Sequence, residues 1–279
     1  MATDEWVVGR PGPRVRPLVE RYVGYRLAGP EPAVHRGLPS RHLTFLVSVG
    51  APIDVVRQSS AAQAPRTYRS VVSGLHAAPA LISHTGGQEG VALELTPLGS
   101  RALFGLPAGA LWDLTLELEE LVGPLGDELW ERLQAVAGWN ARFAVCDTVL
   151  ARLVGDDATA PELAVCWQTL ASTGGRVAIG SLARETGYSR QHLTRRFRQE
   201  FGLGPKLAAR IIRFGQATRT LRSVPSSVSL AEVATTCGYA DQSHLTRDFT
   251  AFAGCSPARW LRDEHLPILQ DEARSAVGA

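Results

Sequence analysis

The chain has 279 residues, of which 45% are hydrophobic and 20% are charged, and its formal net charge is +2. This composition is ordinary for a folded protein and excludes wholesale disorder, and the length favours about two domains. No apolar run approaches the roughly 20 residues that span a bilayer, and the acidic N-terminal stretch lacks the apolar core of a signal peptide. We therefore expect a cytoplasmic protein that does not enter a membrane.

The N-terminal part is predicted to be rich in strands. Residues 1–13 contain Pro and Gly and are expected to be loose. The spacing of Leu18, Val19, Tyr22 and Val23 predicts a short amphipathic helix over 15–27. Short β-branched runs separated by turn residues follow at 42–50, 52–58, 67–76, 80–85 and 90–99. Such runs are typical of a small antiparallel barrel or sandwich.

The pattern then changes to the helical period. Residues 126–138 place Leu129, Leu133 and Val136 on one face, and Asn140 is expected to cap a second helix that ends at Gly155. These two helices are interpreted either as a dimer contact or as core helices packed on the barrel. A polar, acidic stretch over 154–163 predicts a linker. Further helices are predicted at 161–173, 179–186, 190–201, 205–222, 230–237, 242–252 and 257–264.

An internal repeat lies within this helical part. The segment GYSRQHLTRRF at 187–197 is nearly repeated as GYADQSHLTRDF at 238–249, with one extra residue in the second copy. In each copy a Gly permits a tight turn after a helix, and Ser189 or Asp241 caps the next helix. Leu182, Ala183, Leu193 and Phe197, and then Val233, Ala234, Leu245 and Phe249, are predicted to be buried between the two helices of each copy. Each copy is thus a helix-turn-helix unit.

The two copies differ in charge. Residues 161–270 hold 14 basic and 8 acidic residues, a net charge of +6, and the remainder of the chain has a net charge of −4. Within this part, 176–222 has 11 basic and 2 acidic residues, whereas 223–270 has 3 basic and 5 acidic residues. This asymmetry favours a module that binds a polyanion, anchored mainly through its first unit.

The outer faces of the second helices carry side chains that can read base edges. Arg can bond guanine, Gln can bond adenine, and Thr can contact a thymine methyl group. The predicted base-reading residues are Gln191, Thr194 and Arg195 in the first unit and Gln242, Ser243 and Arg247 in the second. The predicted phosphate contacts are Ser189, Arg190, Arg196, Arg198, Arg210 and Arg213. An exposed arginine on a basic helix is more often a solvated charge or a phosphate contact than a reader of bases.

These motifs, in this order, resemble the AraC/XylS-type transcription regulators over about 165–265. The resemblance is carried by LARETGYSRQHLTRRFRQEFGLGP, RIIRFGQATRTL and SLAEVATTCGYADQSHLTRDFTAFAGCSPARW. It implies two helix-turn-helix units joined by a long helix, which bind double-stranded DNA. For the N-terminal part, GLPSRHLTFLVSVG, GLHAAPALISH and LELTPLGSRALFGLP resemble the effector domains of the same family and imply a cupin-like β-barrel. A small-molecule effector, RNA polymerase and a second copy of the chain are the other partners that it suggests.

No catalytic or metal-binding constellation is recognised in the sequence. His35, His42, His76 and His84 form no H-x-H pair and have no carboxylate cluster nearby in sequence. Cys146, Cys166, Cys237 and Cys255 lack metal-ligand spacing and are expected to be reduced and buried. His192 and His244 occupy the same position in the two repeats and are interpreted as packing residues. We therefore expect no cofactor, no metal and no enzymatic activity.

The predicted fold is α+β, a cupin-like barrel with associated helices followed by an all-α domain. The expected divisions are an effector domain at 1–105, a helical self-association segment at 106–155, a linker at 156–164, the DNA-binding domain at 165–270 and a tail at 271–279. The favoured function is a sequence-specific bacterial transcription regulator, whether activator or repressor. The alternatives are an enzyme with a catalytic barrel and a regulatory DNA-binding tail, and a non-specific DNA-coating protein.

Overall fold

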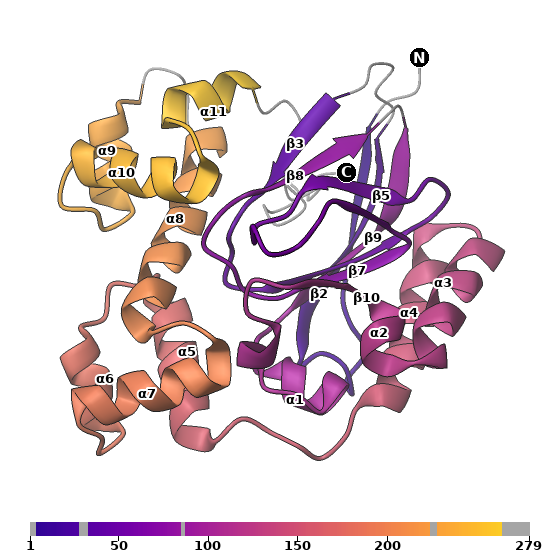
Figure 1. The fold of residues 1–279 in the computed structure, drawn as a ribbon, viewed down its shortest axis with the longest axis horizontal. Coiled ribbons are helices and arrows are strands. Elements are labelled where there is room, and N and C mark those ends of the chain that lie inside the picture. Colours follow the sequence, from indigo (N-terminus) through magenta and orange to yellow (C-terminus); the bar gives the residue numbers. More distant parts are fainter. Residues whose placement is uncertain (1–3, 28–32, 85–86, 224–227, 264–279) are drawn as a thin grey trace, which may run out of the picture.

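Two antiparallel sheets face each other in the N-terminal half of the chain (Figure 1). The structure is a computed structural model that describes residues 4–27, 33–84, 87–223 and 228–263. One sheet has six strands in the order β1-β2-β9-β4-β7-β10 and the other has four in the order β3-β8-β5-β6. The strands are β1 Glu5–Gly9, β2 Val19–Leu27, β3 Ala33–Gly37, β4 Leu43–Ser48, β5 Ile53–Arg57, β6 Arg66–Tyr68, β7 Ser70–Ser73, β8 Ala80–His84, β9 Gln88–Leu95 and β10 Thr115–Glu117.

The five predicted strand regions are confirmed, but the helix predicted over 15–27 is wrong. Residues from Val19 to Leu27 form β2, which pairs with both β1 and β9. Both faces of this strand are covered: Tyr22 packs into the large core, and Val23 and Tyr25 pack into a second cluster between the sheets. Apolar residues on both faces remove the period of two, so the spacing resembled a helix. Within the segment expected to be loose at 1–13, residues Glu5–Gly9 instead form strand β1.

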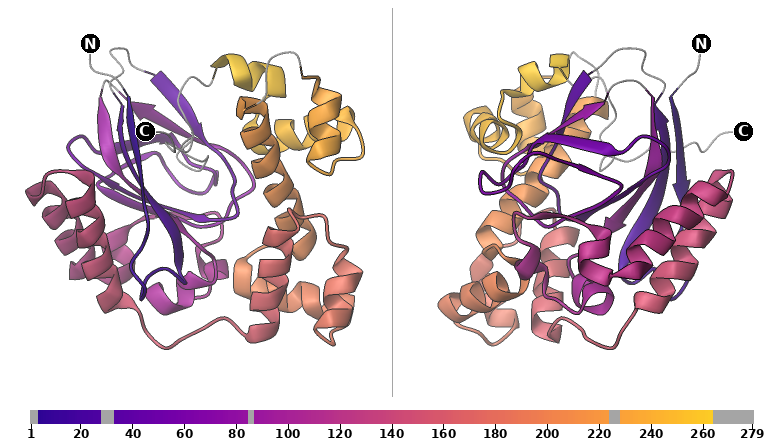
Figure 2. Two further views of the ribbon diagram at one scale, coloured as in Figure 1. Left: turned by 180° about the vertical axis from the view of Figure 1, so that it is seen from behind. Right: turned by 45° about the vertical axis from the view of Figure 1, so that its right-hand side comes forward.

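Helices α3 (Pro124–Ala135) and α4 (Trp139–Leu153) form a hairpin on the side of the sheets that lies away from the C-terminal helices (Figure 2). Leu129 and Leu133 of α3 are fully buried within the chain. The ring of Trp139 lies against Gly24 of β2, where any Cβ would overlap it. Asn140 is not the N-cap that was expected, because the helix begins at Trp139 after the N-cap Gly138 and already includes Asn140. The hairpin therefore packs on the six-stranded sheet as part of its core.

The C-terminal half is helical, as predicted. Its helices are α5 Pro161–Ser172, α6 Ile179–Glu185, α7 Arg190–Phe201, α8 Pro205–Ser223, α9 Leu230–Thr236, α10 Gln242–Ala253 and α11 Pro257–Asp263. Figure 1 shows α6 and α7 at one end of α8 and α9 and α10 at the other. Phe214 of α8 contacts the rings of Phe249 and Phe252 of α10, which fastens the second pair of helices to the connecting helix. The tail expected at 271–279 lies outside the described residues.

One hydrophobic core runs through both halves. It contains Leu103 and Phe104 of α1 (Gly99–Phe104) and Leu111 of the short 3₁₀ helix η1 (Ala108–Leu111) together with Phe197 and Phe201 of α7. The short helix α2 (Leu118–Val122) adds Leu118 to the same core. All four cysteines are free and buried, as expected, and burial raises the pKa of the Cys166 thiol to about 11. No helix among the described residues is long and apolar enough to cross a membrane.

Candidate nucleic-acid interface

The two repeats fold into two helix pairs with the same local geometry. Gly187 and Gly238 follow the first helix of each pair with φ of 70° and 78°, a backbone conformation that favours glycine. Ser189 Oγ accepts the backbone N–H of His192 at 3.1 Å, and Asp241 Oδ1 accepts that of His244 at 2.7 Å. The turn and cap predictions are therefore confirmed in both copies.

The contacts inside each pair also agree with the predictions. The residues predicted to lie between the helices are at most 3% exposed, namely Leu182, Ala183, Leu193, Phe197, Val233, Ala234, Leu245 and Phe249. His192 packs on Tyr188 with ring centroids 4.6 Å apart, and His244 packs on Tyr239 at 5.1 Å. Both histidines thus have the packing role that was expected. The buried faces fix which sides of α7 and α10 are left to solvent.

Helix α7 presents a polar face over a shallow hollow of about 630 Å³. The hollow is lined by Arg190, Gln191, Thr194, Arg195, Arg198 and Gln199. Gln191 and Arg195 are exposed, and Thr194 is half-buried with its hydroxyl donating to the carbonyl of Arg190 at 2.8 Å. Thr194 therefore offers a methyl group and acceptor lone pairs rather than a free donor. The three predicted base-reading residues of the first unit lie on one surface.

Helix α10 presents the corresponding face in the second unit. Gln242, Ser243 and Arg247 are all exposed. Arg247 Nε donates to the carbonyl of Ser243 at 3.3 Å, which leaves the two terminal nitrogens of the guanidinium group for another partner. The three predicted base-reading residues of this unit also lie together on one face of the helix.

The predicted phosphate contacts fall into two groups. Ser189, Arg190 and Arg198 are exposed in and beside α7, and Arg196 is half-buried there. Arg210 and Arg213 instead contact side chains of the second unit. Arg210 donates to Asp248 Oδ1 from Nε at 3.1 Å and from Nη2 at 2.7 Å, and Arg213 lies over the ring of Tyr239. The structure thus gives these two arginines a role in holding α8 against the second unit, which the sequence did not indicate.

The N-terminal half contacts the C-terminal end of α7, which the sequence also did not indicate. Glu200 is 7% exposed and accepts hydrogen bonds from Arg101 Nε at 2.8 Å and from Arg101 Nη2 at 2.9 Å. Thr159 of the connecting segment donates to the same carboxylate at 3.0 Å. Arg101 lies in α1, so this ion pair joins the sheet-rich domain to the first helix-turn-helix unit.

Two glycines allow the same junction to close. A Cβ on Gly109 of η1 would lie 2.7 Å from the carbonyl oxygen of Gln199, so only glycine fits beside the end of α7. Gly202, with a φ of 80°, lies under the ring of Trp112. Hydrogen bonds, an ion pair and close packing therefore hold the C-terminal end of α7 against the sheet-rich domain.

A cluster of three ionisable side chains, which the sequence did not indicate, lies at a different place between the sheet-rich domain and the C-terminal helices. Glu20 of β2, His42 just before β4 and Glu94 of β9 each place one ligand-type atom within 4.8 Å of the others. Glu20 and Glu94 are distant from His42 in sequence, so no local motif indicates the cluster. Antiparallel pairing of β9 with both β2 and β4 brings these distant residues together.

Comparisons with known proteins agree with the sequence motifs. Residues 182–263 match a family described as a helix-turn-helix domain. The chain is similar to ToxT from Vibrio cholerae O395, with 9% identity and a TM-score of 0.49 over 86% of this chain and 96% of that one. It is similar to the C-terminal domain of AraT, a response regulator from Geobacillus stearothermophilus, with 21% identity and a TM-score of 0.35 over 42% and 96%.

A third similar structure is the AraC-like transcriptional activator CuxR, with 12% identity and a TM-score of 0.25 over 81% of this chain and 97% of that one. A search among curated proteins finds no match.

Proposed function

We propose that the chain is a DNA-binding transcription regulator of the AraC/XylS type and that its two recognition helices read bases in successive major grooves. The match of residues 182–263 to a helix-turn-helix family supports this proposal. Helices α7 and α10 are the second helices of their units. Helix α8, with 19 residues, joins the two units and spans about 28 Å. Successive major grooves on one face of B-DNA lie roughly 34 Å apart.

The observation that carries this proposal is the matching pair of polar faces. Gln191 and Arg195 on α7, and Gln242 and Arg247 on α10, are exposed and keep hydrogen-bonding groups that no neighbour uses fully. Amide and guanidinium groups form bidentate bonds with adenine and guanine, and such a pair is worth about 1–3 kcal/mol of discrimination against a wrong base. A protein that coats DNA without specificity needs only cationic groups.

Phosphate contacts would position the protein without reading sequence. In the proposal this role falls to Ser189, Arg190, Arg196 and Arg198 around α7, where the net charge over 176–222 is +9. Arg210 and Arg213 hold α8 against the second unit, and in the proposal they also contact phosphates. The second unit, with a net charge of −2 over 223–270, supplies selectivity more than electrostatic anchoring.

The sheet-rich domain is proposed to act as a cytoplasmic effector domain rather than as an enzyme. Its contacts with the DNA-binding domain support this role, because Arg101, η1 and Trp112 all touch the end of α7. RNA polymerase and a second copy of the chain are further proposed partners. The α3–α4 hairpin lies away from the recognition helices (Figure 2), so a dimer formed through it leaves both helices free for DNA.

The proposal is tested by selecting binding sites from a random duplex pool at two salt concentrations. Wild-type protein is compared with Arg195→Ala, Arg247→Ala and the control Arg152→Ala, which removes an exposed arginine on α4. We expect two short conserved blocks about 10 base pairs apart. Arg195→Ala should relax one block and Arg247→Ala the other, each at a cost of about 1–3 kcal/mol, and Arg152→Ala should relax neither.

Uniform binding across sequences, with a weaker dependence of DNA affinity on salt concentration in both variants, would mean that these arginines contact phosphate. That result would leave a DNA-binding regulator but would overturn the assignment of base-reading residues. The rival enzyme is tested separately by screening the purified protein for turnover of small-molecule substrates, where any turnover that survives repurification would favour it.

A further inference from the structure

The cluster of Glu20, His42 and Glu94 lies where the sheet-rich domain meets the helices of the DNA-binding domain. His42 and Glu94 are 8% and 6% exposed, and Glu20 is 38% exposed. His42 Nε2 is 3.1 Å from Glu20 Oε2, and His42 Nδ1 is 3.9 Å from Glu94 Oε2. A buried imidazole therefore lies between two carboxylates that come from neighbouring strands.

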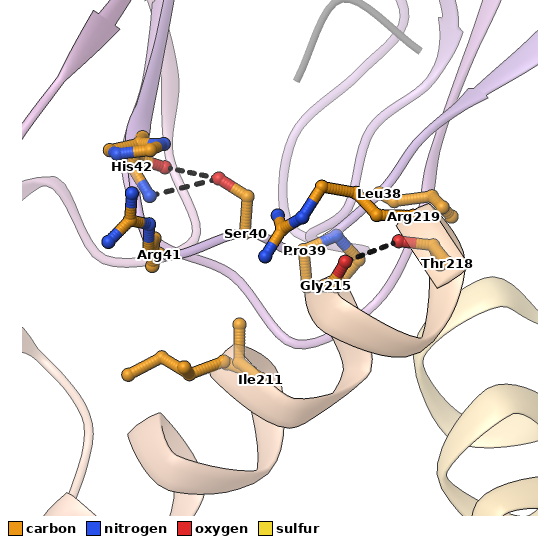
Figure 3. A pocket seen from close by; sticks show the side chains of 10 residues that line it. Leu38, Pro39, Ser40, Arg41, His42, Ile211, Gly215, Thr218 and Arg219 are labelled. Carbon is orange, nitrogen blue, oxygen red and sulfur yellow. Dashed lines mark hydrogen bonds between the residues drawn. The ribbon is translucent and has the colours of Figure 1, made fainter. Parts of the chain in front are cut away.

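The backbone of His42 is held by hydrogen bonds, whereas its ring contacts the two carboxylates. Ser40 Oγ accepts the backbone N–H of His42 and donates to its carbonyl oxygen, both at 2.9 Å (Figure 3). The ring nitrogen Nε2 is buried and makes no hydrogen bond of acceptable geometry. A buried polar atom without a partner is costly. A neutral imidazole nitrogen is also one of the commonest metal ligands in proteins.

Two members of the cluster, Glu20 and His42, line a cavity of about 210 Å³. Its walls include Glu20, His42 and Thr96 from the sheet-rich domain and Trp167 and Gln168 from α5. Three protein ligands beside an open space match metal sites that keep coordination positions for water or an exchangeable ligand. Bonds of about 2.0–2.2 Å hold tetrahedral ligands roughly 3.4 Å apart, and the three ligand-type atoms already lie within 4.8 Å of one another.

Two arginines already neutralise the carboxylates. Arg21 donates to Glu94 Oε1 at 2.5 Å, and Arg41 donates to Glu20 Oε2 at 2.6 Å. Glu94 Oε2, which faces His42, is not the oxygen that Arg21 uses. Arg41 is 30% exposed, and partly exposed ion pairs contribute little to stability. Displacing Arg41 is therefore a small cost beside the free energy of binding a metal ion in a well-formed site.

We propose that Glu20, His42 and Glu94 bind one divalent transition-metal ion, and that this ion is an effector of DNA binding. One imidazole nitrogen and two carboxylate oxygens suit Zn²⁺ and its neighbours better than Ca²⁺ or Mg²⁺, which take oxygen ligands almost alone. Glu94 and His42 form the buried part of the site, and Glu20 closes it from the exposed side.

The position of the cluster gives metal binding a route to the DNA-binding domain. The segment from Leu38 to His42 lines a small pocket against Ile211, Gly215 and Arg219 of α8, as Figure 3 shows. On its other side, Arg41 and His42 face Trp167 of α5. A metal ion that takes the carboxylate of Glu20 releases Arg41 and shifts this segment against both helices. The metal site itself rests on side-chain geometry, whereas the effector role rests on the regulatory function proposed above.

The test measures binding of Zn²⁺ to the full-length protein by isothermal titration calorimetry and metal analysis. The variants are His42→Ala, Glu94→Gln and Glu20→Gln, and the control is His244→Ala, which removes a histidine far from the cluster. We expect one Zn²⁺ per wild-type or control chain and a Kd at least tenfold higher in each cluster variant. If His42→Ala fails to fold, as judged by circular dichroism, Glu20→Gln tests the same claim because its side chain is partly exposed.

Absence of Zn²⁺ binding, or equal binding by wild type and the cluster variants, would overturn the site and leave the residues as an ion-pair network. A second arm measures affinity for a selected DNA site with and without Zn²⁺. A change of at least threefold in wild type that is lost in Glu20→Gln supports the effector role, and an unchanged affinity overturns it. Base selection by metal-free protein tests the DNA-reading proposal independently.

Discussion

The ion pair between Arg101 and Glu200 is expected to be a main attachment of the first helix-turn-helix unit to the sheet-rich domain. Arg101→Ala removes two hydrogen bonds to a carboxylate that is only 7% exposed, as well as a bond to Asp157 at 3.1 Å. After the change, Thr159 is the one side chain among the described residues that still donates to Glu200. The variant should therefore weaken the contact between the two domains.

The size of the effect follows from the geometry. Hydrogen bonds to charged groups contribute about 1.5–3 kcal/mol each. Arg101 is 26% exposed, so water competes for its guanidinium group and reduces the total. We expect a coupling free energy of about 2 kcal/mol between Arg101 and Glu200, smaller than the roughly 3–5 kcal/mol lost on breaking a fully buried pair.

A double-mutant cycle with Arg101→Ala, Glu200→Gln and the double variant measures this coupling through urea unfolding. A control cycle on Arg66 and Glu120, whose side chains are 45% and 43% exposed, should give a coupling free energy of no more than about 0.5 kcal/mol. The reasoning would be refuted by a coupling between Arg101 and Glu200 no larger than that of the control pair.

Three further predictions concern single positions. Gly187→Ala should destabilise the protein by about 1–2 kcal/mol because φ is 70° there; Gly187→Asn should cost less, and equal loss in both would argue against backbone strain. Asp248→Asn should cost about 2 kcal/mol in urea unfolding by weakening both bonds from Arg210, and no loss would mean that α8 and α10 dock without this pair. Burial and nearby His84 lower the pKa of His35 to about 4; the unfolded chain then binds the proton first, so stability should fall by roughly 3 kcal/mol between pH 6.5 and pH 4. His35→Gln should flatten that dependence, and an unchanged slope would exclude His35 as its source.

The helical half was predictable from sequence because its signals are local. The glycine after each first helix, the capping Ser189 or Asp241, and buried residues such as Leu193 all act within a few residues of one another. The helix ends and the turns could therefore be placed correctly. What these local signals do not contain is the ion pair between Arg210 and Asp248, which are 38 residues apart.

The sheet-rich half was less predictable because its contacts are distant in sequence. Strand β2 was predicted as a helix since Tyr22, Val23 and Tyr25 fill cores on opposite faces of one sheet. Glu20 and Glu94 are 74 residues apart, and no spacing rule places them beside His42. Only the order β2-β9-β4 brings the three together. Arg101 and Glu200 are likewise distant in sequence and meet only in the folded chain, across the domain boundary.

The most direct test of the account is to vary the spacing between the two blocks of a selected DNA site. With the natural spacing, α7 and α10 at the two ends of α8 should both be engaged. Insertion of 5 base pairs turns the second block to the opposite face of the duplex, and insertion of about 10 base pairs restores the face but adds roughly 34 Å, which a rigid helix cannot span. We predict that both insertions reduce affinity to that of a site with one block. Binding that is unaffected by either insertion would contradict simultaneous reading by two fixed recognition helices.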